Sequence, residues 1–132
     1  MGERVSEELL EELREKVGKG WGEAGEDRRS FLEGLHHLQE GEVEEATAVF
    51  RRALRQCESP FVELSRYGLG RCSAVQGKEA MALRMFRELT SEKEPALVRR
   101  LAWMEIEALA RGRGDQELQE KAREMAGSCG QE

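Results

Sequence analysis

The stretch that decides the fold is GEVEEATAVFRRAL, residues 41–54. Most of its residues are charged or small, yet Ala46, Phe50 and Ala53 follow one another at intervals of four and three. Side chains with this spacing lie on one face of an α-helix, so the three residues predict an apolar stripe on an otherwise solvated helix. One large ring between two alanines indicates a surface that packs closely against other helices.

The same pattern returns 36 residues later, in GKEAMALRMFRELT at 77–90. Between 31–54 and 67–90, five of the 24 aligned residues are identical. A fainter third copy continues the shift, so that Phe31, Tyr67 and Trp103 follow one another at the same interval. Self-similarity at such a period is typical of helical repeat proteins, whose units bury their apolar faces against their neighbours. The identical pairs are Gly34/Gly70, Gly41/Gly77, Ala46/Ala82, Phe50/Phe86 and Arg51/Arg87.

Each copy divides into two predicted helices joined by a glycine turn. The first copy occupies 27–57, the second 60–90 and the third 95–126. Gly41 can end the first helix of the first copy in a left-handed conformation, and the second copy turns at Gly77. The third copy loses the glycine alignment, since Gly112 and Gly114 flank position 113 and the segment RGRGD forms its turn. Asp115 is a good N-cap for the last helix. We expect a further amphipathic helix at 5–17, which would cap the first copy. The remaining segments are a glycine-rich loop at 18–26 and a frayed tail at 127–132.

Composition agrees with a single all-α domain. The chain has 132 residues, of which 39% are hydrophobic, 5% aromatic and 36% charged, with only two prolines. Its net charge of −6 disfavours binding to nucleic acid, and it has no apolar run long enough to span a membrane. The acidic N-terminus does not resemble a signal peptide, and the three unpatterned cysteines indicate reduced thiols, so we predict a cytoplasmic protein.

No pattern in the sequence predicts catalysis, a cofactor or a metal. His36 and His37 are adjacent and therefore diverge on a helix, and the cysteines lack metal-ligand spacing. The many glutamates alternate with lysines and arginines at helical spacing, as on a solvated face. We therefore expect that the protein is not an enzyme.

The repeated residues resemble the tetratricopeptide repeat (TPR) family over about 31–126. That family places a small residue in its first helix, a glycine seven residues later at the turn, and then an alanine, a large aromatic and another alanine in its second helix. The matching residues here are Gly34, Gly41, Ala46, Phe50 and Ala53 in the first copy, and Gly70, Gly77, Ala82, Phe86 and Leu89 in the second. The resemblance implies a right-handed superhelical solenoid of about three TPR-like helix-turn-helix pairs, which with the capping helix makes about seven helices.

The resemblance also implies a function, since the first helices of such pairs line a concave groove that binds peptides. In that register the groove-facing residues would be Phe31, Leu35, Tyr67, Arg71 and Trp103. A register one residue away makes the aromatic residues ordinary core, and the sequence leaves both open. The Lys–Asn–Arg clamp with which some family members bind acidic C-terminal peptides is absent from these positions.

We therefore predict a non-catalytic adapter or scaffold that binds a peptide or helix of a partner protein in the groove formed by the first helices. The alternative is a structural homo-oligomer that assembles through exposed solenoid faces, because short solenoids leave apolar ends uncovered. A small enzyme is a third and weaker possibility.

Overall fold

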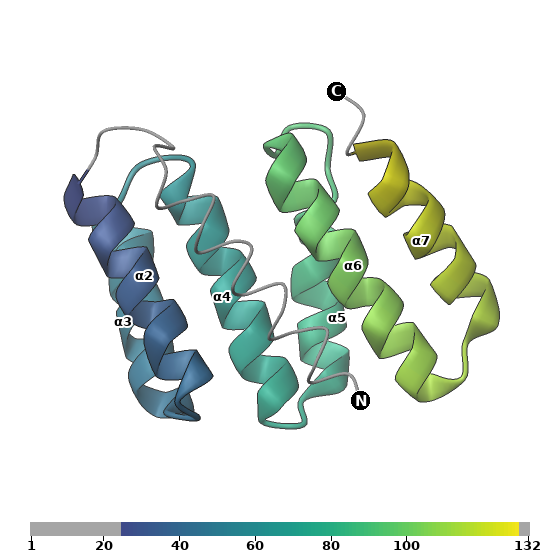
Figure 1. Ribbon diagram of the computed structural model, residues 1–132, viewed down its shortest axis with the longest axis horizontal. Coiled ribbons are helices and arrows are strands. Elements are labelled where there is room, and N and C mark those ends of the chain that lie inside the picture. Colours follow the sequence, from purple (N-terminus) through teal and green to yellow (C-terminus); the bar gives the residue numbers. More distant parts are fainter. Residues whose placement is uncertain (1–24, 130–132) are drawn as a thin grey trace. The chain divides into compact units, whose positions relative to one another are not determined.

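The computed structural model describes residues 25–129, which form six α-helices and no strand (Figure 1). The prediction of an all-α protein is confirmed for this part of the chain. The expected capping helix at 5–17, the loop residues 18–24 and the tail residues 130–132 lie outside the described residues. The helices are α2 (Gly25–Gln39), α3 (Val43–Gln56), α4 (Phe61–Val75), α5 (Glu79–Glu88), α6 (Ala96–Arg113) and α7 (Gln116–Cys129).

The outer bounds of the three helix pairs agree with those of the predicted copies to within three residues. The largest difference is at α7, which ends at Cys129 and so continues three residues beyond the predicted end of the third copy at 126. Just before α4, the Ser59 hydroxyl donates a hydrogen bond of 2.7 Å to the Glu63 carboxylate. Asp115 caps α7 as predicted, because its Oδ1 accepts a hydrogen bond of 3.1 Å from the Leu118 amide.

Three glycines end the first helix of the three pairs in the same conformation. Gly41, Gly77 and Gly114 have φ values of 79°, 80° and 74°, which belong to the left-handed region. The next residue then donates its amide to the carbonyl five positions back, as in a Schellman motif. These bonds run from Glu42 to His37 at 2.8 Å, from Lys78 to Ser73 at 2.9 Å and from Asp115 to Ala110 at 2.9 Å.

The chain forms two compact units, one ending at Cys72 and the other beginning at Ser73, within α4. In the first unit, α2 packs against α3, and the rings of three helices meet. Phe31 of α2 lies 6.0 Å from Phe50 of α3 and 6.4 Å from Phe61 of α4, measured between ring centroids. All three rings are buried and form the core of this unit.

Two glycines enclose the Phe50 ring. A Cβ atom added to Gly34 of α2 would lie 2.4 Å from Phe50 Cε1, and one added to Gly68 of α4 would lie 2.5 Å from Phe50 Cζ. No side chain fits at either position without displacing the ring, so α2 and α4 each approach it through bare backbone. The close approach of Gly68 to the ring was not indicated by the repeat alignment.

In the second unit, α5 packs against α6, and α6 packs against α7. Helix α6 contributes most of the buried side chains, whereas Ala122 is the one buried residue of α7 among those described. Ala82, Phe86 and Leu89, which follow the Gly77 turn, are fully buried as the repeat pattern predicts.

The turns fix the register of the third pair. Gly114 follows Gly77 by 37 residues and not 36, so this pair is one residue longer up to its turn. Counted from the turn, Glu107 stands where Gly34 and Gly70 stand in the other pairs. By the same count, Gln119 takes the place of Ala46 and Ala82, and Arg123 takes the place of Phe50 and Phe86.

Candidate functional site

Four of the five residues predicted to contact a partner are buried. Phe31 and Tyr67 are 0% exposed, Leu35 is 1% exposed and Arg71 is 8% exposed. Phe31 packs against Phe50 and Phe61 in the core of the first unit. These observations favour the core alternative for Phe31, which the sequence had left open. Partner binding by these residues stays a prediction.

Trp103 is the fifth predicted residue, and it differs from the others. It is half-buried and lies in the second unit, whereas the other four belong to the first. It precedes its turn glycine by eleven residues, while Phe31 and Tyr67 precede theirs by ten. Trp103 is therefore one residue out of register with the two buried aromatic residues.

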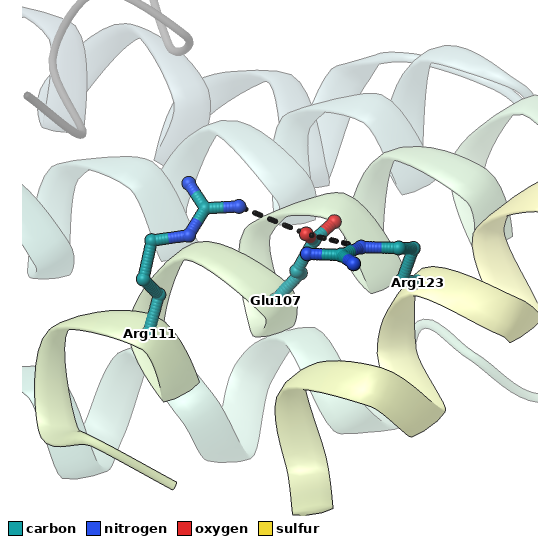
Figure 2. Close-up of polar contacts among 3 residues, drawn as sticks. All are labelled: Glu107, Arg111 and Arg123. Carbon is teal, nitrogen blue, oxygen red and sulfur yellow. Dashed lines mark hydrogen bonds and ion pairs between the residues drawn. The ribbon is translucent and has the colours of Figure 1, made fainter. Parts of the chain in front are cut away.

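A polar cluster joins α6 to α7, as Figure 2 shows. Glu107 Oε2 accepts hydrogen bonds from Arg111 Nη2 at 2.9 Å and from Arg123 Nε at 3.2 Å. With its amide oxygen turned toward the donors, Gln119 accepts from Arg123 Nη2 and Arg111 Nε, each at 3.2 Å. The side chain of Glu107 is 17% exposed, whereas Arg111 and Arg123 are 51% and 62% exposed. The cluster thus forms a hydrogen-bonded bridge between the two helices, with the glutamate as its most protected member.

The Glu107 cluster has little capacity to bind a ligand. Both guanidinium groups are directed to a carboxylate that already neutralises one of them, and the Gln119 oxygen takes further donors. Charge-assisted bonds of this kind fix geometry between helices. We therefore interpret the cluster as a structural contact of the third pair.

The second unit also contains a surface cavity whose arginines, unlike those of the Glu107 cluster, do not bond to a carboxylate among the described residues. This cavity of about 450 Å³ lies at α5 and the C-terminal end of α6, and we call it the arginine pocket. Its described lining consists of two apolar side chains, a glutamate and three arginines. The lining residues are Ala80, Leu83, Arg84, Arg87, Glu88 and Arg113.

The three arginines of the pocket are exposed and have no ion-pair partner among the described residues. Glu88, the acidic residue of the lining, has an interaction of its own. The lining therefore has an excess of positive charge, although the whole chain has a net charge of −6. Unpaired guanidinium groups around an apolar surface are suited to carboxylates, which they can bind with two parallel hydrogen bonds.

The three cysteines are free thiols. Burial, together with a hydrogen bond to Asp27 and its negative charge, raises the pKa of Cys57 to about 11. Burial also raises the pKa of Cys72, against smaller opposing effects from Thr47 and Arg71. Neither thiol resembles an activated nucleophile, because activation requires a lowered pKa.

The two histidines lie at the end of α2. The His37 Nδ1 lies 2.8 Å from Glu42 Oε1 beside the first turn, and His36 is exposed. Within residues 25–129, no group of three or more histidine, cysteine or acidic side chains is arranged to hold a metal ion.

The arginine pocket was not found by reasoning from the sequence. Arg84 and Arg87 share a helix face by their spacing of three, and Arg113 belongs to the segment RGRGD that was interpreted only as a turn. The two signals are 26 residues apart at their nearest, between Arg87 and Arg113. Nothing in the sequence shows that α6 continues far enough to bring Arg113 to α5.

Comparison with known proteins identifies no relative: no family model, curated protein or solved structure matches this chain. Among the helices of the described residues, none combines the length and the apolar character that crossing a membrane requires.

Proposed function

We propose that the protein is a non-catalytic adapter whose TPR-like helix pairs bind a peptide or helix of a partner protein. The observation that carries this proposal is the repetition of one local structure. Gly41, Gly77 and Gly114 close three successive helix pairs with the same left-handed turn and the same hydrogen bond. Repeated helix pairs of this kind form extended surfaces for recognition when they stack as a solenoid.

Two further observations support an interaction role. The arginine pocket provides charge and apolar surface together, which is the usual composition of a peptide-binding site. Trp103 offers a partly exposed indole on the first helix of its pair, and tryptophan is enriched at the centres of interfaces. A cytoplasmic location, where such adapters meet their partners, remains part of the proposal.

Selection from a displayed library of twelve-residue peptides against the immobilised full chain tests the proposal. We expect related peptides to be enriched on the folded chain and lost when the same chain is unfolded in urea. If no peptide prefers the folded chain, the adapter proposal is wrong. For the selected peptides, Trp103→Ala should weaken binding, whereas Leu118→Ala, a half-buried residue on the second helix of the same pair, should not.

A second candidate function is self-association. Val75 and Met81 flank the Gly77 turn and are 54% and 52% exposed, so they place two large apolar side chains in solvent beside one turn. Light scattering across a concentration series separates the two candidates. A mass that rises from the 15.0 kDa of one chain, and returns to it in a Val75→Ser, Met81→Gln variant, would favour the oligomer.

A further inference from the structure

We propose that the arginine pocket binds an internal acidic segment of a partner protein, one in which carboxylates flank a leucine-like side chain. This inference rests on the proposed adapter function and names the ligand of one surface. It concerns α5 and the end of α6, and not the first-helix residues predicted from the repeat pattern.

The first step of the argument is charge. Arg84 and Arg87 project from α5, and Arg113 stands at the C-terminal end of α6, so positive groups reach the cavity from two helices. None of them forms an ion pair with another described residue. An arginine without a counter-ion keeps its full capacity for carboxylates, and groups that converge on one cavity can act on one ligand together.

The second step is shape and polarity. Leu83 is half-buried, and with Ala80 it supplies the apolar part of the lining. A cavity of about 450 Å³ accommodates one or two side chains of a peptide and not a folded domain. The ligand that satisfies both parts of the lining has an apolar side chain for Leu83 and carboxylates on either side for the arginines.

The third step is the choice between a peptide and a nucleic acid as the ligand, since the phosphates of a nucleic acid could also bind the arginines. A phosphate backbone carries charge along its whole length and would be repelled by a protein with 27 acidic and 21 basic residues. A short acidic peptide requires only the local positive charge of the pocket. The apolar lining likewise favours an aliphatic side chain, and none of its described residues offers an aromatic ring on which a base could stack.

The test is fluorescence anisotropy with the full chain and a fluorescein-labelled peptide of sequence Gly-Glu-Glu-Leu-Glu-Glu-Leu-Gly. We expect saturable binding that weakens severalfold between 50 and 200 mM salt, since exposed charges are screened over about 8 Å at physiological ionic strength. The same peptide with Gln in place of Glu, or Ser in place of Leu, should bind at least about tenfold more weakly.

The matched protein variants remove equal charge from two surfaces. The double variant Arg84→Gln, Arg113→Gln should bind the peptide at least about tenfold more weakly. The control is Arg51→Gln with Arg55→Gln, which replaces two exposed arginines of α3 in the first unit. It should change the affinity for the peptide less than twofold. Leu83→Ser should weaken binding of the original peptide, and it should have little effect on binding of the peptide with Ser in place of Leu. Circular dichroism of each variant shows that the helices are retained.

Three results would overturn the inference. The first is equal weakening by the α3 variant, which would indicate a diffuse charge effect. The second is tighter binding of a single-stranded oligonucleotide than of the peptide, with the same dependence on Arg84 and Arg113. The third is that substitutions in the arginine pocket do not change the affinity of peptides selected from the library. This result would leave the adapter function intact. A library that yields no peptide removes the adapter function itself.

Discussion

The first and third helix pairs have the same turn and the same register but opposite chemistry at the contact between their helices. In α2 and α3, a glycine seven residues before the turn meets the fully buried ring of Phe50. In α6 and α7, the corresponding positions hold Glu107 and Arg123, joined by a hydrogen bond of 3.2 Å (Figure 2). At this position the first pair is joined by packing of an apolar ring against a glycine, and the third pair by a hydrogen bond between charged side chains.

The difference follows from what lies beyond the second helix of each pair. Phe50 has Gly34 on one side and Gly68 of α4 on the other, so three helices exclude water from the ring. The side chain of Arg123, by contrast, is 62% exposed. A phenylalanine there would leave apolar surface in water, whereas an arginine can bridge to Glu107 and remain solvated. The comparison shows that the same left-handed glycine turn can join two helices whether the contact between them is apolar or charged.

The largest predicted effect comes from removing the apolar contact. Phe50→Ala should lower the free energy of unfolding by about 3–5 kcal/mol, because it leaves a ring-sized cavity between two glycines that cannot fill it. Urea denaturation followed by circular dichroism measures the loss. Leu54→Ala, on the same helix but 37% exposed, is the control and should cost much less. A cost below about 1 kcal/mol for Phe50→Ala would contradict the packing described for the first unit.

Glycine-to-alanine changes should have opposite signs in the two pairs. Gly34→Ala brings a Cβ to within 2.4 Å of a ring that Gly68 confines on its other side, so we expect a loss of about 1–3 kcal/mol. Gly112 lies inside α6 with no neighbouring atom within 4 Å of an added Cβ, so Gly112→Ala should stabilise by up to about 1 kcal/mol. Thermal melts of both variants decide the matter, and two changes of the same sign would argue against the enclosed ring.

The turns, by contrast, should respond alike in the two pairs. Gly41→Ala and Gly114→Ala each force a Cβ into the left-handed region, at a cost of about 1–2 kcal/mol. Neither position has an atom within 4 Å of an added Cβ, so strain in the backbone is the main cause in both. Denaturant midpoints of the two variants provide the measurement. A much smaller cost at Gly114 would mean that the third turn is not equivalent to the first.

Reasoning from the sequence predicted the all-α class, the six described helices and two of the three turn glycines. It succeeded because helical periodicity and positive-φ glycines are local signals that one segment carries by itself. It placed the third turn less well, since Gly112 and Gly114 flank the position expected from the period. The left-handed φ of Gly114 and the hydrogen bond from Asp115 to Ala110 identify Gly114 as the turn. That single residue also moved Trp103 out of register with Phe31 and Tyr67.

The candidate sites were harder to predict because they depend on contacts between segments. The spacing of Phe31 and Leu35 shows that they share a helix face but not which face is covered, and the structure buries both. Arg84, Arg87 and Arg113 each resemble an ordinary solvated arginine in the sequence. Their significance comes from a shared cavity and from the lack of counter-ions among the described residues, and neither property has a signature in one segment.

The smallest predicted effect is the loss of the charged bridge. Arg123→Ala should cost roughly 0.2–1 kcal/mol, because Arg123 is largely exposed and solvent compensates for much of the lost attraction. The cost should shrink in 0.5 M salt, whereas that of Phe50→Ala should not, because burial of an apolar ring is insensitive to screening. A double-mutant cycle with Glu107→Gln isolates the coupling between the two side chains. If the coupling exceeded about 2 kcal/mol and ignored salt, the third pair would depend on its bridge as strongly as the first depends on its ring, and the distinction between the two pairs would fail.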